Sequence, residues 1–373
     1  MDLELPPERE LLRKASAQYL HDRWPPPRVR AAAERREPVD RGYLAEAADL
    51  GWFAMFIAED DGGGSLSGDP AADATVIAEV RGAVLAPGPF AAVNAAAALI
   101  TRAGSAGQRA RLLPPVAAGS SHVLVAAGGD ALWGDHGVTA RPGGTGLELS
   151  GSLVIIDGPS AATHVVVVPG DPAQTAVVPL DRPGVRRVAM DCLDLTRRAD
   201  RVVLDGVRLE PDLVLHATAG DIAQARAVAV TLAAAETVGA LRRLFEMTTA
   251  YAKDRVAFGR PIGSFQAVKH LMADMSLTVE QARALSAAAV RTLDDERPFA
   301  AEVASMARVF LAERGARLAQ DCLQVHGGIG FSWEHDLHLY LRRIAADAAM
   351  FGTADWHREL ILAAHHEELE PIS

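Results

Sequence analysis

The segment YAKDRVAFGRPIGSFQAVKHLMADM, from Tyr251 to Met275, contains two helical stretches separated by a sharp break. The first helix is predicted to end at Phe258 and the second to begin after Gly263, because glycine and proline interrupt helices. Arg255 then lies near one helix end, and Gln266 lies near the start of the next helix. A guanidinium fork and the free N–H groups of a helix N-terminus both suit a pyrophosphate. The alternative is a plain helical hairpin with an arginine on its surface.

A second segment, CLQVHGGIGFSWEHDLHLYLRR from Cys322 to Arg343, places glycines directly after a helix. Glycines there can form a left-handed cap and a turn, and they also allow a backbone to approach a bound cofactor closely. The two roles are compatible. We interpret His326 as a packed or hydrogen-bonded side chain, because no second histidine or carboxylate stands at ligand spacing. No metal site is predicted.

Outward from these segments, the chain divides into three regions. Residues 1–118 are predicted to form a helical domain, because apolar side chains recur every three to four residues. Residues 119–217 contain short β-rich runs such as THVVVVPG, separated by glycine, proline and aspartate, which predicts a β domain. Residues 218–373 are again helical, with breaks at AFGRPIG, DDERP and HGGIGFSW that separate roughly four helices. The predicted fold is therefore a multidomain α+β chain.

Composition narrows the function. The 373 residues carry a formal net charge of −11, and their basic residues are scattered, which disfavours a nucleic-acid partner. Every long apolar run is broken before about 18 residues and the first residues do not resemble a signal peptide, so we expect a cytoplasmic protein with no membrane insertion. The two cysteines, Cys192 and Cys322, are expected to be reduced. Neither GxGxxG after a strand nor GxxxxGK[ST] is present, which disfavours nicotinamide and P-loop chemistry.

The two segments resemble the acyl-CoA dehydrogenase family of flavoproteins, and the similarity covers nearly the whole chain. It implies an N-terminal helical domain, a middle β-barrel and a C-terminal four-helix bundle, with FAD as cofactor and an acyl-CoA thioester as substrate. It also implies that FAD lies between two chains of an oligomer. The positions that match the family's contacts to the FAD of a neighbouring subunit are Arg255, Phe258, Gln266, Gln324, Gly327 and Gly328.

The reaction of this family also needs a carboxylate base, which takes a proton from Cα while a hydride leaves Cβ for the flavin. Members usually carry that base in a Glu-Gly-Thr loop near the C-terminus, and some carry it on the first helix of the final bundle. In this chain the two positions are Phe351, before Gly352 and Thr353, and Ala229. Neither Phe351 nor Ala229 can accept a proton. Gly352 and Thr353 still resemble FAD-contacting residues.

The middle domain departs from the family as well. Relatives carry polar and aromatic residues against the flavin ring, whereas the corresponding stretches here are VLVAAGGDALWGDHG and GSLVIIDGPSAA. The chain thus keeps the residues that match family contacts to a neighbour's FAD. It lacks most of the residues that would hold its own flavin.

Three hypotheses follow. In the first, which we favour, the chain is one subunit of a heteromeric acyl-CoA dehydrogenase, resembles the smaller subunits of α2β2 enzymes that degrade steroid side chains, and completes the FAD site of a catalytic partner. In the second, the chain is a self-sufficient homo-oligomer with Glu236 as a displaced base, whose pKa burial would raise. An ion pair of Glu236 with Arg242 or Arg243 is the preferred alternative for this side chain, and Asp347 is a weaker candidate base.

In the third hypothesis, the chain is a non-catalytic interaction subunit that binds neither FAD nor acyl-CoA. The retained Arg255 and Gln266 disfavour this hypothesis. For either enzyme, an electron-transfer flavoprotein or a similar protein is a candidate electron acceptor.

Overall fold

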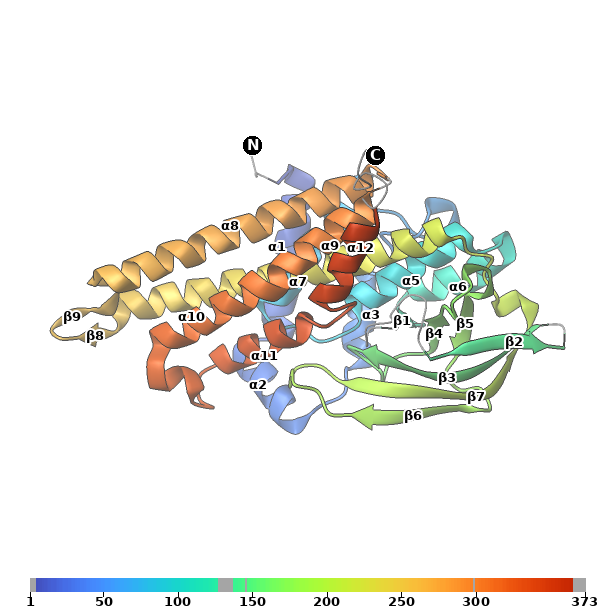
Figure 1. Cartoon of the computed structure of the whole chain (residues 1–373), viewed down its shortest axis with the longest axis horizontal. Coiled ribbons are helices and arrows are strands. Elements are labelled where there is room, and N and C mark those ends of the chain that lie inside the picture. The colour runs from blue at the N-terminus through green and yellow to red at the C-terminus, as the bar shows by residue number, and fades with distance from the viewer. Residues whose placement is uncertain (1–4, 127–136, 145, 298, 365–373) are drawn as a thin grey trace, which may run out of the picture.

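The computed structural model describes residues 5–126, 137–144, 146–297 and 299–364, and its first region is helical as predicted (Figure 1). Proline occupies the first turn of three of these helices, and Asp40 and Ser105 cap two others. The helices are α1 (Pro7–Arg23), α2 (Pro26–Arg35), α3 (Arg41–Asp49), α4 (Pro70–Ala83), α5 (Phe90–Ala103) and α6 (Ala106–Ala117).

The middle region consists of strands, and the described ones pair into two sheets. A three-stranded sheet has the order β1 (Val123–Val125), β4 (His164–Val167), β5 (Ala176–Pro179), with β1 parallel to β4. A four-stranded antiparallel sheet has the order β2 (Thr139–Gly143), β3 (Gly146–Ile156), β7 (Ala199–Leu209), β6 (Val185–Met190). The barrel that the resemblance implies is therefore built from two sheets. Most of the first flavin-facing stretch, residues 127–136, lies outside the described residues.

The third region is a helical bundle, and all three predicted breaks are confirmed. A hairpin of β8 (Val256–Ala257) and β9 (Arg260–Pro261) separates the two long helices, while the second break falls between the helix that ends at Asp294 and the one that begins at Ala300, and the third at residues 327–336. A π-helical turn, Leu311–Gly315, joins two further helices end to end. The helices are α7 (Ala219–Asp254), α8 (Gln266–Asp294), α9 (Ala300–Phe310), α10 (Ala316–His326), α11 (Leu337–Asp347) and α12 (Ala354–Ala364).

The contact between α4 and α7 ties the first region to the bundle. A Cβ on Gly82 of α4 would lie 1.8 Å from the carbonyl oxygen of Glu236, and one on Gly239 of α7 would lie 1.9 Å from that of Glu79. Two helices can approach so closely only where side chains are missing. This approach brings the buried face of α7, and with it Glu236, against the arginine that precedes Gly82 in α4.

The molecule is elongated, with the sheets at one end and the β8–β9 hairpin at the other (Figure 1). The long helices α7 and α8 carry that hairpin well beyond the rest of the chain. Among the described residues, no helix combines the length and the apolar character needed to cross a membrane.

Candidate functional site

The two sequence segments meet at the hairpin end of the bundle. The ring of Tyr251, near the end of α7, stacks on that of His326 at the end of α10, with 4.4 Å between ring centroids. The Tyr251 hydroxyl donates to the carbonyl oxygen of His326 at 3.4 Å, and His326 Nδ1 lies 2.9 Å from the carbonyl oxygen of Cys322. The predicted packed and hydrogen-bonded role of His326 is confirmed, and the described residues contain no cluster suited to a metal.

The hairpin presents its side chains to solvent. Arg255, Phe258 and Gln266 are all exposed, and Phe258 is 96% exposed. The backbone turns at Phe258 and Gly259, whose φ angles are 52° and 78°. No side chain caps the N-terminus of α8, and Arg255 forms no ion pair with the part of the chain that the structure describes. An aromatic ring, a guanidinium and a helix N-terminus are therefore available to another molecule.

The glycines after α10 are equally open. Gln324, Gly327 and Gly328 are exposed, and a Cβ on either glycine would meet nothing within 4 Å. Gly327 has a φ of 60°, which explains a glycine at this helix end. At Gly328 the backbone is also accessible, but its φ angle does not require a glycine. We call the six residues Arg255, Phe258, Gln266, Gln324, Gly327 and Gly328 the outer set.

The loop that carries Phe351 lies inside the protein instead. Phe351 is 1% exposed, and its carbonyl oxygen lies 3.1 Å from Nε2 of His357. The other ring nitrogen of His357 lies 3.0 Å from the Ser305 hydroxyl, and burial lowers the pKa of His357 to about 3. Arg308 Nη2 donates to the carbonyl oxygen of Met350 at 2.8 Å. The loop is thus fixed from α9 and α12.

Gly352 and Thr353 have local structural roles in this loop. Gly352 has a φ of 116°, and a Cβ there would stand 2.6 Å from the Trp356 ring. Thr353 Oγ1 accepts a hydrogen bond from the Trp356 N–H at 3.3 Å at the start of α12. Their contact with FAD stays a prediction.

Glu236 is bound by two arginines from other domains. Its Oε1 accepts a hydrogen bond from Arg81 Nε at 2.9 Å, and its Oε2 accepts one from Arg197 Nη2 at 3.1 Å. All three side chains are almost fully buried. The expected partners Arg242 and Arg243 were wrong: both reach Glu246, and Arg242 also pairs with Glu79, because they lie on a different face of α7.

Arg197 is the centre of a larger group of charges. It pairs with Asp157 at 2.9 Å and also with Asp347, whose second oxygen accepts a hydrogen bond from Thr237 at 3.0 Å. Arg343 pairs with Asp194, which lies 3.8 Å from Arg197. The group joins α4, the end of β3, the β6–β7 connection, α7 and α11. We call it the ion cluster; its members are Arg81, Asp157, Asp194, Arg197, Glu236, Arg343 and Asp347.

The environment moves the pKa values of two cluster carboxyls in opposite directions. Burial raises the pKa of Asp157 to about 6 although Arg197 and Arg343 oppose the change. Burial would also raise the pKa of Asp194, but Arg343 and Arg197 hold it below its ordinary value. Burial thus outweighs the arginine charges at Asp157, whereas the arginine charges outweigh burial at Asp194.

Comparisons with known proteins identify the fold's relatives. Family models for the N-terminal and C-terminal domains of acyl-CoA dehydrogenases match residues 6–120 and 223–366. The acyl-CoA dehydrogenase IpdE2 of Mycobacterium tuberculosis is 33% identical over 92% of this chain and 93% of its own. This chain belongs to the acyl-CoA dehydrogenase family. Its members are FAD-dependent oxidoreductases that act on CH–CH bonds.

Two solved structures of the family are also similar. A variant of the steroid acyl-CoA dehydrogenase Tcur3481-Tcur3483 has a TM-score of 0.86 and 27% identity, covering 97% of this chain and 98% of its own. The ChsE4-ChsE5 complex of Mycobacterium tuberculosis has a TM-score of 0.88 and 24% identity, covering 99% of this chain and 100% of its own, which shows a shared fold.

The outer set fits part of an FAD. Open space in front of two glycines allows a backbone to approach a flat or phosphate-bearing group, and Arg255 and the α8 N-terminus offer donors to a pyrophosphate. These residues lie at the end of the molecule opposite the sheets (Figure 1). The ion cluster offers no comparable opening, because its charged side chains are buried and paired with one another.

The arginines and aspartates of the ion cluster were not predicted from the sequence, apart from Asp347. A signal was available in DCLDLTRRAD, from Asp191 to Asp200, where two arginines and three aspartates stand within ten residues. Arg81 was a second signal, as a lone cation in the apolar helix ATVIAEVRGAV. A buried charge requires a partner, so each of these residues implied an opposite charge elsewhere.

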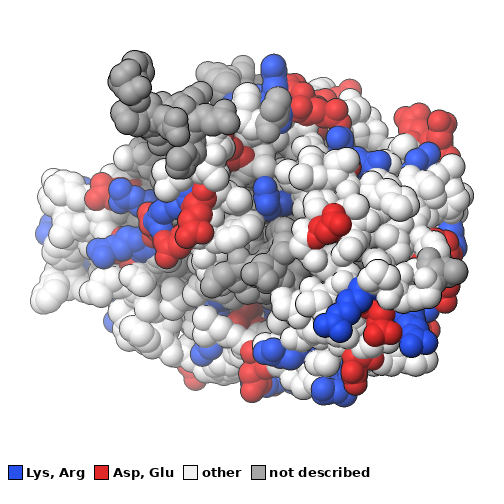
Figure 2. Space-filling view, turned by 45° about the vertical axis from the view of Figure 1, so that its right-hand side comes forward, with Lys and Arg blue, Asp and Glu red and all other residues white. Residues whose placement is uncertain are grey.

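The charges on one face of the molecule are not concentrated in this way. On the face that Figure 2 shows, basic and acidic side chains are interspersed over most of the molecule rather than gathered in one stripe. That face therefore carries no strong field of a single sign.

Proposed function

We propose that this chain is the subunit of a heteromeric acyl-CoA dehydrogenase that lacks the catalytic base and completes the FAD site of a catalytic partner. The partner supplies the carboxylate that takes the Cα proton of an acyl-CoA. When bound, FAD accepts the hydride from Cβ. This chain contributes the outer set, which binds and orients that FAD from across the interface.

One observation carries the proposal: both candidate carboxylates, Glu236 and Asp347, are already bound to arginine. Phe351 and Ala229 replace the two usual bases, and both are buried. Glu236 and Asp347 are the acidic side chains that stand closest to these positions along α7 and α11, and Arg197 holds both. A carboxylate whose oxygens are engaged by buried guanidinium groups is not free to contact the Cα of a substrate unless those contacts are broken.

Relatives support the oligomeric part of the proposal. One similar structure is that of the ChsE4-ChsE5 complex, and another carries the paired name Tcur3481-Tcur3483. In the heteromer proposed here, this chain would take the position of the subunit without a base. Electrons would then leave the reduced partner site for an electron-transfer flavoprotein or a similar acceptor.

Co-expression tests the proposal directly. The chain would be purified alone and together with an acyl-CoA dehydrogenase that carries the Glu-Gly-Thr loop, and FAD would be measured by its visible absorbance. We expect colourless protein alone, and a yellow complex that is bleached by an acyl-CoA. Stoichiometric FAD and bleaching in the lone chain would overturn the proposal.

A single substitution in the outer set tests the proposed FAD contact more specifically than co-expression does. Arg255→Ala should lower the FAD content of the heteromer while leaving the complex assembled, because the side chain is exposed and unpaired within the described residues. Arg317→Ala is the matched control, since Arg317 is an exposed arginine of the same bundle whose partner, Asp321, lies one turn away. Equal FAD content in both variants would contradict the assigned role of Arg255.

The self-sufficient enzyme remains a distinct outcome of the same test. If the lone chain binds FAD and is reduced by an acyl-CoA, Glu236→Gln decides whether Glu236 is its base. Loss of turnover with retained folding would support that base, and full activity would eliminate it. Absence of FAD from every combination would instead indicate an interaction subunit.

A further inference from the structure

A cavity of about 410 Å³ lies where the start of α7 and the end of α8 meet the α3–α4 connection and the last turns of α5. Its volume falls within the range of small-molecule sites. Neither the outer set nor the ion cluster contributes a residue to its lining. Because the hairpin lies at the opposite ends of α7 and α8 (Figure 1), this cavity is separate from the proposed flavin contact.

Part of the cavity lining is apolar and buried. Met55 and Ile57 come from the α3–α4 connection, Val228 from α7 and Leu293 from α8. None of these four side chains is more than 6% exposed. We call them the apolar wall. Such a surface favours the aliphatic or aromatic part of a ligand, because contact with it removes apolar area of the ligand from water.

Four of the described lining residues are charged, and three of these are acidic. Arg102, the one cation, pairs with Glu296 at 3.0 Å and with Asp221 at 3.3 Å, so its charge is already engaged. Asp294 accepts two N–H groups at the start of α4, at 2.7 and 3.0 Å. The Glu59 carboxylate, by contrast, forms neither an ion pair nor a hydrogen bond with any described residue. This carboxylate is therefore available to a ligand.

Two uncharged polar side chains of the lining are also unused. The Ser65 hydroxyl and the Gln224 amide are half-buried, and neither forms a hydrogen bond within the described ranges. Their polar atoms remain in contact with solvent, unlike the sealed hydroxyl of Ser286, so a molecule in the cavity can reach them. A hydroxyl oxygen, an amide oxygen and a carboxylate all accept hydrogen bonds. The cavity thus offers several acceptors to which the described chain supplies no donor.

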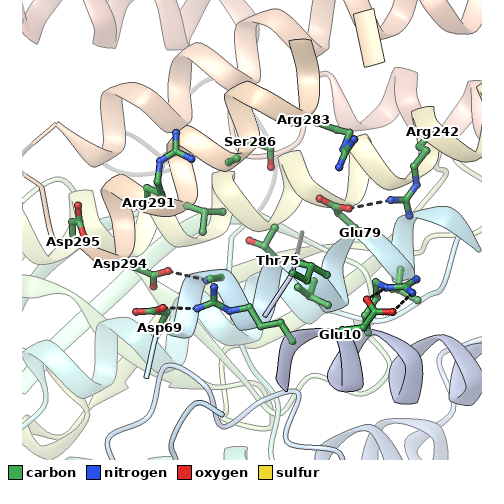
Figure 3. Close-up of a pocket in the computed structure, with 18 residues that line it drawn as sticks. Glu10, Asp69, Thr75, Glu79, Arg242, Arg283, Ser286, Arg291, Asp294 and Asp295 are labelled. Atoms are coloured by element: carbon green, nitrogen blue, oxygen red, sulfur yellow. Dashed lines mark hydrogen bonds and ion pairs between the residues drawn. The ribbon is translucent and has the colours of Figure 1, made fainter. Parts of the chain in front are cut away.

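A larger cavity, of about 720 Å³ between α1, α4 and α8, shows the contrast (Figure 3). Five arginines and five carboxylates line it, so its lining has no formal net charge. Several of these groups pair with one another, as Arg242 does with Glu79 and Arg13 with Glu10 (Figure 3). In the smaller cavity, three carboxylates face one guanidinium, which gives its lining a formal net charge of −2. The smaller cavity therefore favours a cation.

We propose that the smaller cavity binds a small organic cation, an amine whose apolar body packs on the apolar wall. The Glu59 carboxylate pairs with the ammonium group, and the Ser65 hydroxyl and the Gln224 amide oxygen accept further hydrogen bonds from it. An alkylammonium has three N–H donors and no acceptor, so it complements a lining whose unused groups are acceptors. The negative lining disfavours carboxylates and phosphates, and with them the phosphate-bearing part of an acyl-CoA.

Phenethylamine is a suitable probe, because it is a cation at neutral pH and its ring can pack on the apolar wall. Isothermal titration calorimetry would measure its binding to the purified full-length chain in its native oligomeric form. We expect saturable binding of the amine. Phenethyl alcohol has the same body without the charge and should bind at least about fivefold more weakly. Hydrocinnamate, which carries a carboxylate instead, should show no saturable binding.

Two substitutions test the polar contacts with little change in side-chain size. Glu59→Gln removes the charge and should weaken phenethylamine binding about two- to fivefold, because Glu59 is exposed. Gln224→Met removes the amide and should weaken binding about three- to tenfold. Circular dichroism should show both variants folded as the wild type is.

Matched controls come from the same protein. Asp60 follows Glu59 in the same exposed turn, and Gln281 is an exposed glutamine of α8, but neither lines the cavity. Asp60→Asn and Gln281→Met should therefore leave the phenethylamine affinity unchanged. The proposal is overturned if the wild type shows no saturable binding of the amine, or if the alcohol or the carboxylate binds as tightly. It is also overturned if the cavity variants bind as the wild type does, or if the controls weaken binding equally.

Discussion

The hairpin end of the bundle and the ion cluster differ in almost every physical respect. At the hairpin end, Phe258 is 96% exposed, and Arg255 is exposed with no ion-pair partner in the described ranges. In the ion cluster, Arg197 and Glu236 are almost fully enclosed and each binds more than one charged partner. One region is ready to contact another molecule, and the other has satisfied its own groups.

This difference separates two parts of an enzyme that normally coexist in one chain. A residue that binds a neighbour's cofactor needs exposure and an unused donor, whereas a base needs a free carboxylate at the reacting carbon. The chain meets the first requirement at Arg255 and not the second at Phe351. In the function proposed here, the chain would bind a cofactor across an interface without carrying out the proton abstraction.

The largest expected effect comes from removing the centre of the ion cluster. Arg197→Ala leaves Asp157, Glu236 and Asp347 without their shared cation, so we expect the free energy of unfolding to fall by about 3–5 kcal/mol. Urea unfolding followed by circular dichroism measures this change. Arg317→Ala, at an exposed pair of the bundle, should change the same quantity by less than about 0.5 kcal/mol. Similar losses in both variants would remove the contrast between the two regions.

A second prediction concerns pH. The raised pKa of Asp157, about 6 against an ordinary 3.8, means that the folded state holds this proton more tightly than the unfolded state. Stability from this group is present below about pH 4 and is lost as the pH rises through about 6, by at most roughly 3 kcal/mol. Asp194 acts in the opposite sense, because its lowered pKa makes stability fall as the solution becomes more acidic.

Asp157→Asn removes the titrating carboxyl of Asp157 and so isolates its contribution to the pH dependence of stability. The variant should show a flatter dependence of unfolding free energy on pH between about 4 and 6. Asp355→Asn is a control, since Asp355 is an exposed carboxyl whose one ion pair among the described residues is with Arg358, one turn along α12. An unchanged pH profile in Asp157→Asn would contradict the assigned titration.

Two glycines provide a third and smaller contrast. Gly352 lies in the buried loop, where a Cβ would stand 2.6 Å from Trp356 and where φ is 116°, so Gly352→Ala should destabilise the chain by about 1–3 kcal/mol. Gly328 faces open space, so Gly328→Ala should leave stability within about 0.5 kcal/mol. Thermal unfolding compares the two. Equal destabilisation would show that the hairpin end is as constrained as the loop.

Local patterns in the sequence predicted more of this molecule than long-range ones. The breaks between helices were found because glycine and proline act on neighbouring backbone, and the three regions follow from the hydrophobic period. The partner of Glu236 could not be found in this way. It depends on Arg81 and Arg197, which lie 155 and 39 residues away and approach only through tertiary packing. Phe351 and Ala229 at the two base positions were visible in the sequence, but the arginine partners of Glu236 and Asp347 were not.

The smallest effect on stability is expected at the tip of the hairpin. Phe258→Ser removes an aromatic side chain that is almost entirely in solvent, so the unfolding free energy of the lone chain should change by less than about 0.5 kcal/mol. If the outer set binds a partner's FAD, the same variant should lower the FAD content of the heteromer and weaken its assembly, both measurable by size-exclusion chromatography with absorbance detection. Leu362→Ser, at an apolar residue of α12 that is 59% exposed, is the control. A variant at Phe258 that is neutral in both assays would leave the hairpin without a binding role, and the resemblance to an interface would then rest on Arg255 and the glycines alone.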